Sequence, residues 1–96
     1  MSNDDVKART IEELAIRDIM ANEGCRAFMW RCLEMSGIFA DNFDPDPYVH
    51  ARNAGARSQG LWLQRELMSV TPGSYSKMLE ESNNVRSSSN RSSSDD

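Results

Sequence analysis

Residues 23–39 read EGCRAFMWRCLEMSGIF, and this stretch predicts one amphipathic helix with defined ends. Its apolar and thiol side chains recur at the i, i+3, i+4 and i+7 spacing of a single buried face, which Ser36 completes: Cys25, Phe28, Met29, Cys32, Leu33 and Met35. Asn22 suits the N-cap, and Gly37 suits the left-handed position that ends a helix. We therefore expect a helix over residues 23–36 with this stripe facing the core.

Apolar side chains repeat at the helical period on both sides of this stretch. Residues 47–70 form the longest such pattern, with Asp46 as N-cap and Pro47 at the first helical position. After Thr71, which can cap the next helix, Tyr75 begins an i, i+3, i+4 patch. The sequence predicts an all-α fold, a small bundle of three main helices (6–20, 23–36 and 47–70) with a short C-terminal helix (72–82).

Two glycines lie inside the predicted helix 47–70. Gly55 and Gly60 each cost roughly 1 kcal/mol relative to alanine in a helix interior. Close approach of a second helix is the usual benefit that offsets this cost. We expect Gly60 to let this helix cross the preceding one near Phe28 and Cys32.

The chain is long enough for one domain. Of its 96 residues, 1–5 are expected to fray, 6–82 to form the helical domain, and the serine-rich residues 83–96 to form a disordered tail. Only Val85 is apolar in that tail, so burial there cannot offset the entropy of ordering it. A domain of this size is near the lower limit for folding alone, so a partner or self-association would stabilise it.

The charge distribution argues against a general nucleic-acid-binding protein. The net charge is −4, whereas phosphate contacts need a basic face. The arginines are concentrated in the centre, because residues 24–65 contain five arginines and four acidic residues. The excess of acidic residues lies toward the two ends.

No pattern for catalysis, cofactor binding or membrane insertion is visible. Cys25 and Cys32 are separated by about 10 Å along one helix, which is too far for a disulfide, and we interpret both as buried thiols. His50 has no nucleophile arranged with it. Asp41, Asp44 and Asp46 could suggest calcium, but they lack the spacing of a calcium-binding loop, and turn and capping chemistry explains them. No apolar run approaches the roughly 20 residues of a spanning helix.

Three motifs resemble a small helical domain family of tailed bacteriophages and prophages, typified by a Bordetella phage protein. The first two are a Glu-Gly-x-Arg helix with a tryptophan that ends in glycine, and a second helix with Gly-x-Arg-x-x-Gly-Leu-Trp-Leu. The third is a proline-started segment with an aromatic residue and Met-Leu. The matching residues are Glu23, Gly24, Arg26, Trp30, Gly37, Ile38, Phe39, Gly55, Arg57, Gly60, Leu61, Trp62, Leu63, Pro72, Tyr75, Met78 and Leu79.

The resemblance covers residues 12–82, with two departures. Ser36 stands where the family commonly has cysteine, and Ala56 where it commonly has arginine. The second departure weakens any role that would need a basic pair there. The resemblance implies no known activity; it implies genes found near portal and capsid genes.

We therefore expect a non-enzymatic phage protein, an interaction module in virion head or portal structure or morphogenesis. The alternatives are a nucleic-acid-associated accessory protein and, third, an enzyme of unrecognised type. The expected partner is a phage head or portal protein, with self-association as a further expectation and no membrane. The expected location is the host cytoplasm during assembly, with incorporation into the virion as a second one. The candidate partner-binding residues are Arg26, Trp30, Arg52, Arg57, Leu61 and Trp62.

Overall fold

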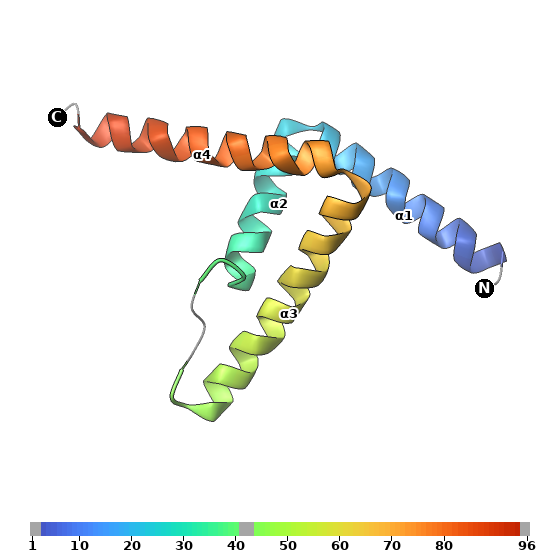
Figure 1. The fold of residues 1–96 in the computed structure, drawn as a ribbon, viewed down its shortest axis with the longest axis horizontal. Coiled ribbons are helices and arrows are strands. Elements are labelled where there is room, and N and C mark those ends of the chain that lie inside the picture. The colour runs from blue at the N-terminus through green and yellow to red at the C-terminus, as the bar shows by residue number, and fades with distance from the viewer. Residues whose placement is uncertain (1–2, 41–43, 95–96) are drawn as a thin grey trace.

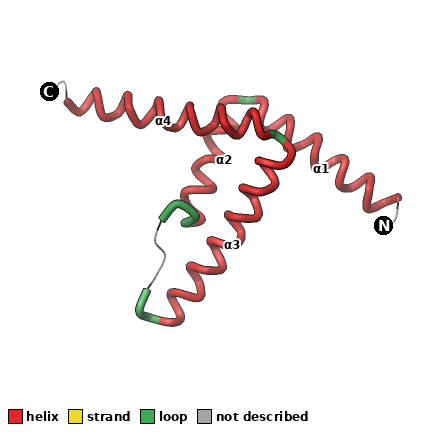
Figure 2. The backbone as a smooth tube through the Cα atoms, in the orientation of Figure 1, coloured by secondary structure: helices red, strands yellow, loops and turns green. Residues whose placement is uncertain are grey.

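The computed structural model describes residues 3–40 and 44–94, with side chains described as far as residue 86, and these parts of the chain form helices and no strand (Figures 1 and 2). The helices are α1 (Asn3–Ala21), α2 (Glu23–Ser36), α3 (Pro47–Val70) and α4 (Pro72–Ser94). The all-α class and the three main helices are confirmed. Helix α1 begins at Asn3, within the segment expected to fray, and Met1 and Ser2 lie outside the described residues.

Helices α2 and α3 form an antiparallel hairpin, and α4 crosses the end of the hairpin where α3 finishes (Figure 1). Helix α1 leaves the same junction in the direction opposite to α4. Each helix contacts the other three, yet the molecule measures 59 × 38 × 15 Å and is therefore flat. The outer ends of α1 and α4 extend as two arms beyond the region where all four helices meet.

The core lies at this junction and takes at least one side chain from every helix. The buried members come from all four helices: Met20, Leu33, Leu67, Tyr75 and Met78. The Tyr75 hydroxyl remains satisfied because it accepts a hydrogen bond of 2.9 Å from Gln64 Nε2. Because the core is this small, a few contacts hold the four helices in their relative positions.

Local capping chemistry explains most helix ends. The Asn22 side chain accepts a 3.0 Å hydrogen bond from the Cys25 amide, and Gly37 adopts φ 85° at the end of α2, both as predicted. Asp46 accepts a 2.9 Å bond from the Tyr48 amide and begins α3 beside Pro47. Thr71 differs from the prediction, because its hydroxyl donates to the Leu67 carbonyl of α3 and does not cap α4.

The buried face of α2 agrees with the predicted one only in part, since Met29 and Leu33 pack in the core as expected. Arg26, Met29, Trp30 and Leu33 face the other helices, whereas Phe28 is 62% exposed and Met35 is 77% exposed. The true stripe is rotated by about one residue, roughly 100° around the helix. The prediction was wrong for Phe28 and Met35 because it ranked side chains by hydrophobicity and treated a buried arginine as a surface residue.

The expected close approach at Gly60 is confirmed, but its location is not. A Cβ at Gly60 would overlap the Ser36 hydroxyl and would lie 2.5 Å from Ser36 Cβ and 2.8 Å from Ile38 Cγ2. The contact is therefore made at the C-terminal end of α2, not near Phe28 and Cys32. Helix α3 is ten residues longer than the 14-residue α2, so its first half runs past the end of its neighbour.

Helix α4 is longer than predicted, since it continues to Ser94 instead of ending near residue 82. The sequence has no proline or glycine after Gly73, and extending an existing helix avoids the cost of nucleating one. Arg86 forms a 3.6 Å ion pair with Glu34 of α2, which ties the middle of α4 to the hairpin. The disorder expected for residues 83–96 stays a prediction about the chain in solution, and residues 95–96 lie outside the described part.

Two smaller expectations concern the cysteines and the aspartates. Both cysteines are free, but Cys25 is exposed and Cys32 half-buried, so the interpretation as two buried thiols was wrong. The rotated face of α2 explains this, since Cys25 belongs to the stripe that turned outward. Asp44 accepts a bond from the Asp46 amide, in keeping with turn chemistry, and Asp41 lies outside the described residues.

Candidate protein-interaction surface

The outward side of α3 combines apolar and basic side chains. We call it the outer α3 face, and it consists of Arg57, Leu61, Trp62, Arg65 and Met68. Its members fall on one side of the helix at 100° per residue, away from the inward side that contains Gly60 and Leu67. Trp62 is 53% exposed, Met68 49% and Leu61 38%.

The inward packing of α3 explains why this face is open. Gly60 and Leu67 are buried against the other helices, and in the described part of the chain the flat arrangement leaves no helix over the opposite side. Trp62 therefore lies on the surface of the protein. Exposed large apolar side chains that gather in one place usually mark an interaction site.

The charge of the outer α3 face is uniformly positive. Helix α3 contains one acidic residue, Glu66, and it is turned toward α1, where its Oε2 lies 2.7 Å from Arg9 Nη1. Arg57 and Arg65 are exposed and have no acidic neighbour on their own face. Tryptophan with arginine is the composition typical of residues that anchor protein interfaces.

Arg26 lies in the interior. It is only 5% exposed, and its Nε and Nη2 donate hydrogen bonds of 2.7 and 2.9 Å to the two carboxylate oxygens of Glu81. Its Nη1 donates a 2.8 Å bond to the Met20 carbonyl near the end of α1. One guanidinium thus joins α1, α2 and α4, and it is not presented to a partner.

The Arg26–Glu81 pair perturbs both of its members. The hydrogen bonds from Arg26 hold the pKa of the Glu81 carboxyl below its ordinary value, although partial burial opposes this. The same contact raises the pKa of Arg26. The sequence alone did not suggest this pair, because its members are 55 positions apart and Glu81 looked like a residue at the end of a short helix.

Trp30 and Arg52 also lie apart from the outer α3 face. Trp30 is half-buried against the core and stacks on Phe39, with ring centroids 4.9 Å apart and an angle of 25° between the planes. Arg52 is exposed, but it precedes Leu61 by nine positions, which places it about 180° around α3. Of the six candidates, the structure brings together Arg57, Leu61 and Trp62.

Arg65 and Met68 were missed by the sequence reasoning, although a usable pattern was present. Arg65 follows Leu61 by four positions and Trp62 by three, and Met68 follows Leu61 by seven. These spacings put them on the same side of a helix. The pattern was overlooked because only the stripe that was expected to be buried was extended to the end of the helix.

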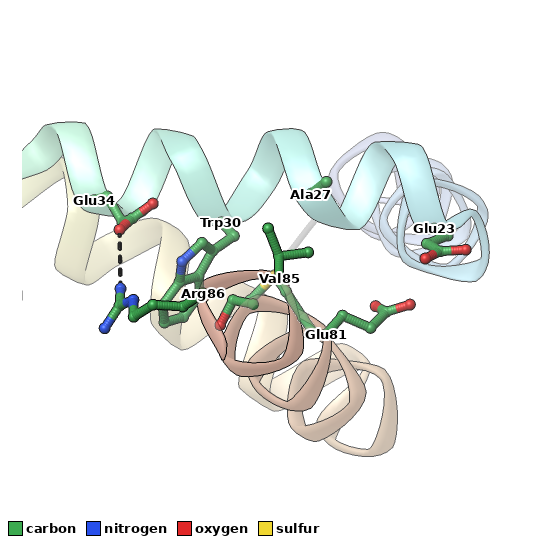
Figure 3. A pocket seen from close by; sticks show the side chains of 9 residues that line it. Glu23, Ala27, Trp30, Glu34, Glu81, Val85 and Arg86 are labelled. Atoms are coloured by element: carbon green, nitrogen blue, oxygen red, sulfur yellow. Dashed lines mark ion pairs between the residues drawn. The ribbon is translucent and has the colours of Figure 1, made fainter. Parts of the chain in front are cut away.

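A groove of about 390 Å³ lies between α2 and α4. Figure 3 shows Trp30 and Val85 between the two helices, with the Glu34–Arg86 ion pair toward one end and Glu23 toward the other. Glu81 also lines it. Because Glu81 and Glu34 are each paired with an arginine, two of the three carboxylates in the groove are already neutralised within the chain.

Within the described residues, no group of three or more His, Cys, Asp or Glu side chains is placed to hold a metal ion. The helices in that part of the chain include none with the length and apolar content needed to cross a membrane.

These features define an all-helical domain with a small shared core and one basic, aromatic helix face. A family model described as Bbp19-like phage protein matches residues 16–80, and the chain belongs to this family. The match includes all five buried core residues and the entire outer α3 face, and it leaves out residues 3–15 of α1 and residues 81–94 of α4. Neither the curated proteins nor the solved structures that were compared gave a match.

Proposed function

We propose that this phage protein is not an enzyme and acts by binding a protein through the outer α3 face during head or portal assembly. The observation that supports this most directly is the exposure of Trp62 beside Leu61 and Met68 on a helix side that also has two arginines with no ion pair to any described residue. Membership of a phage protein family supports the phage context of this proposal. The partner surface that fits is an apolar pocket with acidic residues at its rim.

The proposed location follows from this role. The chain would meet its partner in the host cytoplasm during assembly and could remain in the finished virion. A flat molecule with one open helix face suits docking in several copies on a ring or shell of identical subunits, because each copy buries the same face.

The test is a pull-down of phage head and portal proteins with the parent chain and with Trp62→Ala. Loss of binding is expected, together with a melting temperature close to that of the parent, because Trp62 is half-exposed and outside the core. Phe28→Ala is the matched control, since Phe28 is an aromatic residue of similar exposure on α2. If Trp62→Ala and the charge reversal Arg57→Glu both bound as well as the parent chain, the proposal would be contradicted.

A second candidate function uses the same face. Arginine beside tryptophan with no acidic neighbour can also bind a single-stranded nucleic acid by stacking and phosphate contact. The net charge of −4 opposes it. Binding of a single-stranded oligonucleotide that weakens steeply with salt and is lost in Trp62→Ala would favour this function over the protein-binding one.

A further inference from the structure

The outward side of α1 has a repeating pattern that the core does not use. We call it the α1 seam, and all of its members are exposed: Asp4, Lys7, Ile11, Leu14, Asp18 and Ala21. Their alternating spacing of three and four is the heptad spacing of a helix that packs along a second helix. Ile11 is 67% exposed and Leu14 57% exposed, although both are apolar.

The α1 seam lies opposite the side of α1 that packs on the rest of the molecule. The inward side holds Met20 and Ile16 against the core, and Arg9 reaches Glu66 of α3. At 100° per residue, Ile11 and Leu14 fall well over 100° away from these residues around the helix. No described residue of the same chain covers the seam.

The order of residues along the seam is self-complementary when one copy is reversed. In an antiparallel pair of α1 helices centred between residues 12 and 13, Ile11 lies opposite Leu14 of the second copy. In the same register Lys7 lies opposite Asp18 of the second copy. The two-fold axis repeats both contacts, so two apolar pairs are flanked by two pairs of opposite charge.

A parallel pair would lack this match. It would place Lys7 against Lys7, Asp18 against Asp18 and Asp4 against Asp4, and like charges opposite one another disfavour pairing. Lys7 and Asp18 also form no ion pair within the chain among the described residues, so both are available. The charge pattern thus selects the antiparallel arrangement.

We propose that a second copy of this chain docks antiparallel on the α1 seam and forms a symmetric dimer. The arrangement is sterically open, because α1 projects as an arm from the four-helix junction (Figure 1) and the two bodies would lie on opposite outer sides of the helix pair. In the dimer, Ile11 and Leu14 of each α1 helix would gain the apolar packing that they lack in a single copy. A contact along about five helical turns is smaller than a standard interface of roughly 1,600 Å², so the dimer is weak.

The test measures the mass of the full-length chain by sedimentation equilibrium up to about 1 mM, a range suited to weak interfaces. The parent is expected to approach the mass of two chains. Lys7→Glu alone and Asp18→Lys alone should each weaken dimerisation by about tenfold, because each creates two like-charge contacts per dimer. An equimolar mixture of the two variants should dimerise again, as should the double variant, because both restore opposite charges.

These substitutions separate loss of the dimer from loss of the helix. Glu at position 7 and Lys at position 18 both favour the local helix dipole, so circular dichroism should show no loss of helix. Arg31→Glu, which makes the same charge change on an exposed part of α2, should leave dimerisation unchanged.

Ile11→Ser should weaken the dimer without lowering the stability of the single chain, because Ile11 is exposed there. A parent that stays monomeric throughout would overturn the proposal. So would a dimer that is insensitive to the two charge reversals, or one that the double variant fails to restore.

Discussion

At the scale of single residues, two glycines of α3 that look alike in the sequence have opposite roles. Gly60 lies against Ser36 and Ile38, whereas a Cβ at Gly55 would meet nothing within 4 Å. Neither position has a positive φ, since Gly37 is the only described residue that does. Space, and not backbone conformation, therefore distinguishes them.

This difference gives a paired prediction. Gly60→Ala should lower the free energy of unfolding by about 1–3 kcal/mol, because the new methyl group overpacks the contact with α2 despite the better helix propensity. Gly55→Ala should raise it by up to about 1 kcal/mol, because only the propensity changes. Urea denaturation of both variants measures the two effects, and a Gly60→Ala variant more stable than the parent would show that α2 and α3 are not in close contact there.

The partly buried pair of Arg26 and Glu81 predicts a dependence on pH. Because the folded state lowers the pKa of Glu81 from its ordinary value of 4.5, the pair stabilises the fold fully above that pH. Its contribution is lost as the pH falls below 4.5 toward the lowered folded pKa. Glu81→Gln should therefore melt below the parent at pH 7, and the difference between the two melting temperatures should shrink in acid. A difference that stays constant down to pH 3 would argue against the pair.

At the scale of helices, α2 shows which of two adjacent apolar stripes the fold buries. Leu33 is completely buried, whereas Phe28, which was predicted on the same stripe, lies on the side that turned outward and is mostly exposed. Leu33→Ala should lower the free energy of unfolding by about 2–5 kcal/mol, and Phe28→Ala should change it by less than about 0.5 kcal/mol. Chemical denaturation of the two variants compares them directly. Equal losses in the free energy of unfolding would mean that Phe28 is as buried as Leu33, contrary to the structure.

At the scale of the whole molecule, the shared core predicts cooperative unfolding. All four helices contribute to one cluster, so none of them has a core of its own. Helical circular dichroism and the fluorescence of Trp30, which packs on that cluster, should report the same transition. The measurement is made in a Trp62→Phe background, so that the exposed tryptophan does not contribute. Two separate transitions would indicate that the α2–α3 hairpin is stable without α1 and α4.

The sequence by itself determined much of the local structure. Asn22, Gly37 and Asp46 with Pro47 define helix ends through contacts within a few residues, so their roles could be read without the fold. The helical period of the apolar residues established the all-α class. The motifs shared with the phage family were also visible, because they depend on residue order alone.

Only the tertiary structure decided which faces are buried and which residues are available to a partner. Two stripes of α2 are about equally apolar, and the buried one is the one that pairs Arg26 with a carboxylate 55 positions away. Periodicity cannot distinguish such stripes, because it measures spacing and not the partners that satisfy a buried charge. For the same reason Arg26 became an internal link between helices. The spacing of Arg65 and Met68 already put them beside Leu61 and Trp62, but only the fold decided that this side of α3 is open.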